Sequence, residues 1–244
     1  MMPATSPAAQ TGPAAAPRRR WVSDAPTRMF HWLFALCFVG AYLTSEGERW
    51  RALHVTLGYG LAGLFAFRLV YGLLGPRPLR PDVLWRKLAG LPAWLRAAAA
   101  GDVRWRQGQH LLMAAILLAL LALVLPLTLS GYATYQDWGG EWLEELHEFF
   151  GNSVLALVLA HVGLILGLSL LRRQNQGLPM LTGRVAGPGP DLLPRQRRGL
   201  AAALLLALLA FGAWQWQASP TGLLPDKTWH PERHHDRDDD DERD

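Results

Sequence analysis

Five long apolar blocks dominate the chain, at residues 29–43, 53–74, 110–130, 147–171 and 199–217. A helix needs about 20 apolar residues to cross the hydrocarbon core of a bilayer. The first block is short, but residues 21–28 extend it, and Trp32 and Tyr42 mark its ends as aromatic anchors. The pattern therefore predicts an all-α integral membrane protein with five transmembrane helices.

Lys and Arg side chains gather on one side of these predicted spans. The segment before the first span and the connections 76–109 and 172–198 together hold 17 of them, against six on the other side. Basic connections stay in the cytoplasm. We therefore expect a multi-pass protein of a bacterial inner membrane, with its amino terminus in the cytoplasm and its carboxyl terminus in the periplasm.

The segments outside the apolar blocks predict the remaining organisation. Residues 1–20 are rich in Ala and Pro and lack an apolar core, which favours a disordered cytoplasmic leader over a cleaved signal peptide. Residues 187–217 are interpreted as a linker and the fifth span, and residues 218–244 as an exported tail. Within the tail, residues 226–244 carry nine acidic and four basic groups.

The single cysteine, Cys37, and the lack of a CxxCH motif exclude a disulfide framework and covalent haem.

Histidines inside the predicted spans are the strongest functional signal. His147 and His161 are 14 residues apart on one predicted helix, so they project to nearly the same side, about 21 Å apart along the axis. His54 begins its span at the same depth as His147, and His31 begins its span at the depth of His161. Neutral imidazole is a strong iron ligand, and two imidazoles fill both axial positions of a haem. The pattern predicts two b-type haems, one near each face of the membrane.

Neighbouring residues support this interpretation. Gly58 and Gly151 each follow a predicted ligand by four residues, which leaves room for a flat porphyrin on the same helix face. Arg68 is the only charged residue deep in a span, and we expect it to pair with the propionates of the inner haem. His110 has no partner at its depth and is interpreted as interfacial. Simpler roles stay open, because a membrane histidine or glycine often serves helix packing and Arg68 could reach the membrane surface.

With these residues identified, the chain resembles the bacterial cytochrome b561 family, which includes the b-type cytochrome subunit of nickel-iron hydrogenases. The resemblance spans about residues 21–186 and rests on stretches 24–32, 50–59 with 67–68, 145–161 and 180–184. It implies an all-α fold, a four-helix haem-binding membrane bundle, to which this chain adds a fifth C-terminal transmembrane helix. It also implies the same two histidine pairs, with electrons exchanged between the quinone pool and a partner redox protein.

The region after residue 186 departs from the family pattern, and this departure affects which redox partner we expect. A hydrogenase-type subunit does not need an acidic tail, so a periplasmic c-type cytochrome is ranked above a hydrogenase as the partner. The tail itself is interpreted as a solvated acidic segment. Two alternatives are steering of a basic cytochrome and weak metal binding by His230, His234 and His235.

The leading hypothesis is a di-haem electron carrier between quinone and a periplasmic redox protein, with the lipid bilayer around it and no nucleic-acid partner. The rival functions are a superoxide-oxidising quinone reductase, a hydrogenase cytochrome b subunit and a haem-free membrane anchor. Side-chain type alone suggests two regions for a quinone. They are Trp105, Arg106 and His110 on the inner side, or Tyr132, Tyr135 and Trp138 on the outer side.

Overall fold

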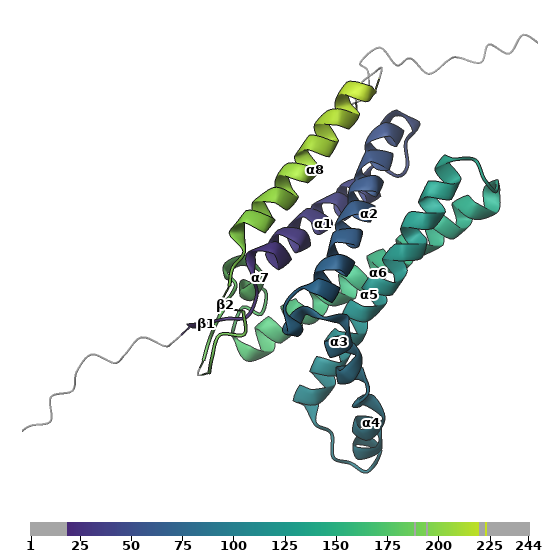
Figure 1. Ribbon diagram of the computed structural model, residues 1–244. Helices are drawn as coiled ribbons and strands as arrows, with labels where there is room; N and C mark the ends of the chain where they lie inside the picture. The colour runs from purple at the N-terminus through teal and green to yellow at the C-terminus, as the bar shows by residue number, and fades with distance from the viewer. Residues whose placement is uncertain (1–18, 188, 194, 220–222, 224–244) are drawn as a thin grey trace, which may run out of the picture.

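The computed structural model describes residues 19–187, 189–193, 195–219 and 223. Five long helices dominate the described chain and form an elongated bundle (Figure 1). They are α1 (Ala25–Leu43), α2 (Arg51–Leu74), α5 (Trp105–Tyr135), α6 (Glu141–Arg172) and α8 (Arg198–Ala218). The shorter elements are β1 (Arg19–Trp21), η1 (Glu48–Trp50), η2 (Arg77–Leu79), α3 (Pro81–Leu88), α4 (Leu91–Ala99), α7 (Leu178–Thr182) and β2 (Arg184–Ala186).

Four helical segments are long and apolar enough to cross a membrane. They are Glu48–Leu74, Trp105–Tyr135, Glu141–Arg172 and Arg198–Ala218. Large apolar side chains on their outer faces, such as Leu166 and Leu206, are exposed, as lipid-facing residues of a membrane helix are. The chain is therefore a multi-pass membrane protein. The 19-residue α1 is not among the four segments, so a total of five crossings stays a prediction.

The core lies where α1, α2, α5 and α6 meet. Its central side chains include Phe38 of α1, Leu64 of α2, Leu127 of α5 and Val154 of α6, which is only 1% exposed. α5 packs along α6, α1 packs along α2, and α8 packs on α1 and α2. Cys37 is buried in this cluster and packs there as a small apolar residue.

The two ends of the bundle differ in structure (Figure 1). At one end, β1 pairs antiparallel with β2, so the chain after α6 returns to the segment that precedes α1. We call this the ribbon end, and it also holds the starts of α1, α5 and α8. At the other end, residues 44–50 and 136–140 join α1 to α2 and α5 to α6. We call this the hairpin end.

A buried carboxyl group fastens three elements at the ribbon end. Asp24, 0% exposed, caps α1 by accepting hydrogen bonds from the Thr27 backbone N at 3.2 Å and the Thr27 hydroxyl at 2.6 Å. The Tyr71 hydroxyl of α2 donates to its other oxygen. Arg197, just before α8, donates to Tyr71 Oη at 3.0 Å and lies 4.0 Å from Asp24. The cap fixes where α1 begins, which sets the position of His31 two turns later.

Several predicted boundaries need correction. Arg19 and Arg20 were predicted to lie in a disordered leader, but they belong to β1, because their backbones pair with β2. α5 and α6 extend beyond the predicted blocks 110–130 and 147–171, since helical hydrogen bonding continues into polar turns that an apolar pattern does not mark. Residues 1–18 and 224–244, with most of the predicted leader and tail, lie outside the described residues.

Candidate functional site

The four membrane histidines come together as two pairs. The rings of His31 on α1 and His161 on α6 have centres 6.5 Å apart. The rings of His54 on α2 and His147 on α6 have centres 6.0 Å apart. These are the two pairs that depth in the membrane predicts, the first toward the ribbon end and the second toward the hairpin end.

The spacing within each pair leaves room for one metal ion between the rings. Two imidazoles that share a metal at metal–nitrogen distances of about 2 Å have ring centres roughly 6 Å apart. Both measured separations, 6.5 and 6.0 Å, lie close to that value. The donor set of each pair therefore fits a bis-imidazole iron centre.

Backbone carbonyls orient the hairpin-end pair. His54 Nδ1 lies 2.8 Å from the carbonyl oxygen of Ala41 on α1, and His147 Nδ1 lies 3.1 Å from that of Leu127 on α5. The Ser130 hydroxyl is 3.3 Å from the same His147 nitrogen. An Nδ1–H group that donates to a carbonyl leaves the lone pair on Nε2, the nitrogen available to a metal. Neighbouring helices thus fix both the ring orientation and the tautomer.

The ribbon-end pair is held differently. The Nδ1 atoms of His31 and His161 are buried and have no hydrogen-bond partner among the described residues. Buried polar atoms are nearly always paired in folded proteins. The ribbon-end imidazoles therefore lack the carbonyl acceptors that hold the hairpin-end pair, and no described residue fixes their tautomers.

A cavity of about 840 Å³ surrounds the hairpin-end pair, lined by residues of α1, α2, α5 and α6. Gly58 and Gly151, the two glycines predicted to face a porphyrin, both line it. A Cβ added to Gly58 would meet no atom within 4 Å, and one added to Gly151 would meet only Leu127 Cδ1, at 3.9 Å. Both glycines therefore leave open space beside the histidines, as a flat macrocycle against their helices would require.

Gly131 is a site residue that sequence reasoning missed. A Cβ at this position of α5 would lie 2.6 Å from His147 Cε1, so a side chain here would displace the ring. The only signal in the sequence is the small pair Ser130-Gly131 inside an apolar span, which is typical of close helix packing.

Arg68 and His110 have different environments. Arg68 is half-buried, and its Nη2 donates to the Leu79 carbonyl at 3.1 Å. Its Nη1 is buried without a partner among the described residues, so one donor group of the guanidinium remains available. His110 is exposed near the start of α5 and belongs to neither pair.

A helical membrane bundle that presents facing imidazoles from different helices has the architecture of a membrane-bound b-type cytochrome. The family model of prokaryotic cytochrome b561 matches residues 22–183, more than half of the chain, and the chain belongs to this family. Membership identifies it as a membrane haem-b protein of electron transport. The match ends before α8. Among curated proteins and among solved structures, no significant match to the chain was found.

Proposed function

We propose that the chain holds two haem b groups and carries electrons across the membrane between the quinone pool and a periplasmic redox partner. The observation that carries the proposal is the two pairs of facing imidazoles, 14 residues apart along α6, with ring centres 6.5 and 6.0 Å apart within the pairs. His161 and His147 would each share an iron with His31 and His54, respectively. Their 14-residue separation spans about 21 Å of a hydrocarbon core about 30 Å thick.

Each bound haem supplies a one-electron iron couple, and two axial imidazoles favour electron transfer over oxygen binding. The protein contributes orientation and charge. The Ala41 and Leu127 carbonyls hold His54 and His147 through Nδ1, and Nε2 of each ring would be the nitrogen that binds the iron. The free Nη1 of Arg68 is suited to a propionate of the ribbon-end haem, because a half-buried guanidinium needs a carboxylate partner.

The proposed orientation puts the ribbon end in the cytoplasm. The segment before α1 and the connections 76–109 and 172–198, which hold most of the Lys and Arg, lie at this end. Basic connections of membrane proteins stay in the cytoplasm. The hairpin end then faces the periplasm. With α1 counted as a crossing, the chain has five spans and its carboxyl terminus is also periplasmic.

The charge of the hairpin end supports a basic partner. Residues 44–51 and 136–148 carry seven carboxylates and two Arg, and the cavity around His54 and His147 is lined by Glu46, Glu144 and Glu148. An acidic mouth attracts a cationic protein and repels a small anion. The partner proposed is therefore a basic c-type cytochrome, and the same charges disfavour superoxide as the substrate.

The test is haem analysis of the purified full-length protein. Pyridine haemochrome spectra should give two haem b per chain, and reduction by a quinol should be followed by electron transfer to a basic c-type cytochrome. A protein without haem would instead be a membrane anchor. Co-purification with a hydrogenase, rather than with a cytochrome, would change the partner and leave the haem assignment intact.

A further inference from the structure

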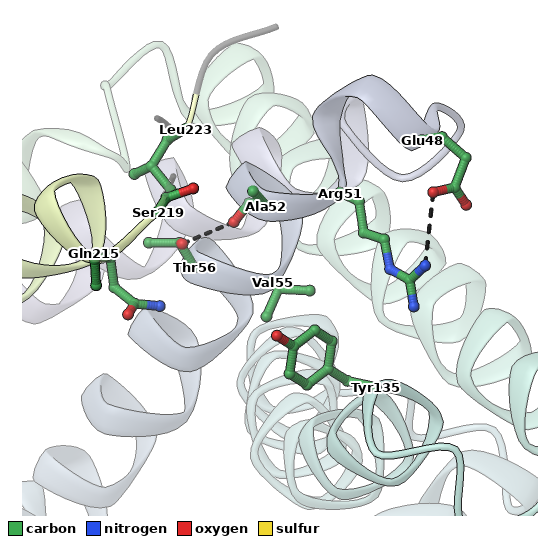
Figure 2. Close-up of a pocket in the computed structure, with 10 residues that line it drawn as sticks. Glu48, Arg51, Ala52, Val55, Thr56, Tyr135, Gln215, Ser219 and Leu223 are labelled. Atoms are coloured by element: carbon green, nitrogen blue, oxygen red, sulfur yellow. Dashed lines mark hydrogen bonds and ion pairs between the residues drawn. The ribbon is translucent and has the colours of Figure 1, made fainter. Parts of the chain in front are cut away.

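A second cavity of about 550 Å³ lies beside the hairpin-end histidine pair, between α2, α5 and α8 (Figure 2). Arg51, Val55 and Tyr135 line both this cavity and the larger one around His54 and His147. The two cavities therefore share a wall. The third side comes from α8, through residues such as Gln215, and α8 lies beyond the stretch that matches the family.

The cavity combines an apolar surface with a few polar groups from three helices. Its apolar lining includes Val55, Ala218 and Leu223. Tyr135 of α5 and Gln215 of α8 direct their polar ends toward the space between them (Figure 2). A phenol hydroxyl and a carboxamide each both donate and accept hydrogen bonds. This is the usual composition of a site for a mostly apolar small molecule that has a few polar atoms.

We propose that this cavity binds the ring of an isoprenoid quinone or quinol, with the Tyr135 hydroxyl and the Gln215 amide as hydrogen-bond partners of its ring oxygens. The proposal rests on the proposed function and locates its quinone. Pockets of about 300–1,000 Å³ hold small organic ligands, and 550 Å³ falls in that range. The ring would enter from the bilayer beside α8, so its apolar tail would stay in lipid.

Charge at the rim argues against a phospholipid headgroup. Arg51 is the cation of this lining, and its Nη1 already faces Glu48 Oε2 at 3.6 Å. An anionic phosphate that approached Arg51 would therefore also be repelled by the carboxylate of Glu48. A quinone or quinol ring is neutral and does not meet this repulsion.

Aromatic contacts connect this cavity to the histidine site. Tyr135 lies against Tyr59, with ring centres 6.3 Å apart, and Tyr59 lines the larger cavity. Val55 follows the proposed ligand His54 directly in α2 and lines both cavities. A ring bound here is thus separated from the hairpin-end site by single side chains. Of the residues suggested by side-chain type, the geometry selects Tyr135 on the outer side.

The test uses the full-length protein in lipid nanodiscs, photolabelled with an azido-ubiquinone in competition with decylubiquinone. Label should appear on the peptide that contains Gln215 or on the one that contains Tyr135. Gln215→Leu should raise the half-maximal concentration of decylubiquinone about tenfold, as the loss of one buried hydrogen bond predicts. Tyr135→Phe should have a similar effect. The matched control is Gln217→Leu, since Gln217 is exposed on the same helix and should leave binding unchanged.

Three results would overturn the proposal. They are label confined to the start of α5 near His110, equal effects of Gln215→Leu and Gln217→Leu, or labelling of the same peptides by an azido-phospholipid that decylubiquinone does not displace. Pyridine haemochrome analysis of the same samples separates this proposal from the proposed function. Two haems with label elsewhere would refute the cavity alone, whereas absent haem would refute the electron-transfer function whatever the label shows.

Discussion

At the scale of single residues, the two histidine pairs are supported unequally. Backbone carbonyls hold the Nδ1 atoms of His54 and His147, whereas those of His31 and His161 are unpaired among the described residues. A hydrogen bond at Nδ1 makes an imidazole a more basic ligand and fixes its orientation. The two proposed haems should therefore differ in spectrum and reduction potential.

This difference makes the ligand assignment testable one residue at a time. His31→Ala and His161→Ala should each remove the same spectral component, and His54→Ala and His147→Ala should each remove the other, because a site that loses an axial ligand loses its low-spin b spectrum. Low-temperature difference spectra measure the losses. His110→Ala is the control and should leave the haem content at the wild-type level. Loss of one common component from the His31 and His54 variants would refute the pairing.

Arg68 tests the charge balance of the ribbon-end haem. Arg68→Leu should weaken or shift the ribbon-end component more than the other, because a propionate would be left unpaired in a site of low dielectric constant. Arg68→Lys should partly restore it, since the charge returns without the fork geometry. Redox titration of the two components gives the comparison. Equal loss of both components would indicate a folding defect and no specific pairing.

Gly131 tests the fit of the hairpin-end site. In Gly131→Ala the new methyl group would lie 2.6 Å from His147 Cε1, and relieving such a clash in a packed site costs about 1–3 kcal/mol. We expect selective loss of the hairpin-end component, measured by haem content and thermal unfolding. Gly212→Ala is the control, because a Cβ at Gly212 meets nothing within 4 Å. Unchanged haem in both variants would show that the ring has room to move.

At the scale of elements, the sequence predicts the long helices well and their connections poorly. Apolar blocks and histidine depth are local properties, so they lead directly to α2, α5, α6 and α8 and to the two ring pairs. The β1–β2 ribbon and the amphipathic α3 and α4 escaped prediction, because each is short and the ribbon joins segments far apart in sequence. The role of Gly131 was also not predicted, because it depends on a contact with the His147 ring, which belongs to another helix.

The Asp24 cluster determines how α1, α2 and α8 are joined, and it yields an element-scale prediction. Asp24→Ala removes the cap and leaves the Tyr71 hydroxyl without its acceptor, so it should destabilise the protein by at least about 2 kcal/mol. Asp24→Asn keeps a capping oxygen and should cost less. Thermal unfolding in detergent gives the ranking. Equal stability of both variants and the wild type would show that α1 does not depend on this cap.

At the scale of the whole molecule, the two ends of the bundle carry opposite charge. Basic segments meet at the ribbon end, whereas residues 44–51 and 136–148 at the hairpin end hold seven carboxylates and two Arg. This difference in charge between the two ends is what we expect of a membrane protein that is inserted in one orientation and binds a cationic partner at its periplasmic end.

The last prediction follows from that polarity. The double variant Glu144→Gln/Glu148→Gln removes two charges from the mouth of the hairpin-end cavity, and it should slow electron transfer to a basic c-type cytochrome severalfold at low salt while the haem spectrum stays unchanged. The difference should shrink as ionic strength rises toward 0.15 M, where the Debye length falls to about 8 Å. Stopped-flow reduction of the cytochrome at several salt concentrations measures both effects. A matched pair, Glu144→Asp/Glu148→Asp, keeps the charge and should keep the rate. If the neutral and acidic double variants exchanged electrons equally fast at low salt, the acidic mouth would have no part in recruiting the partner.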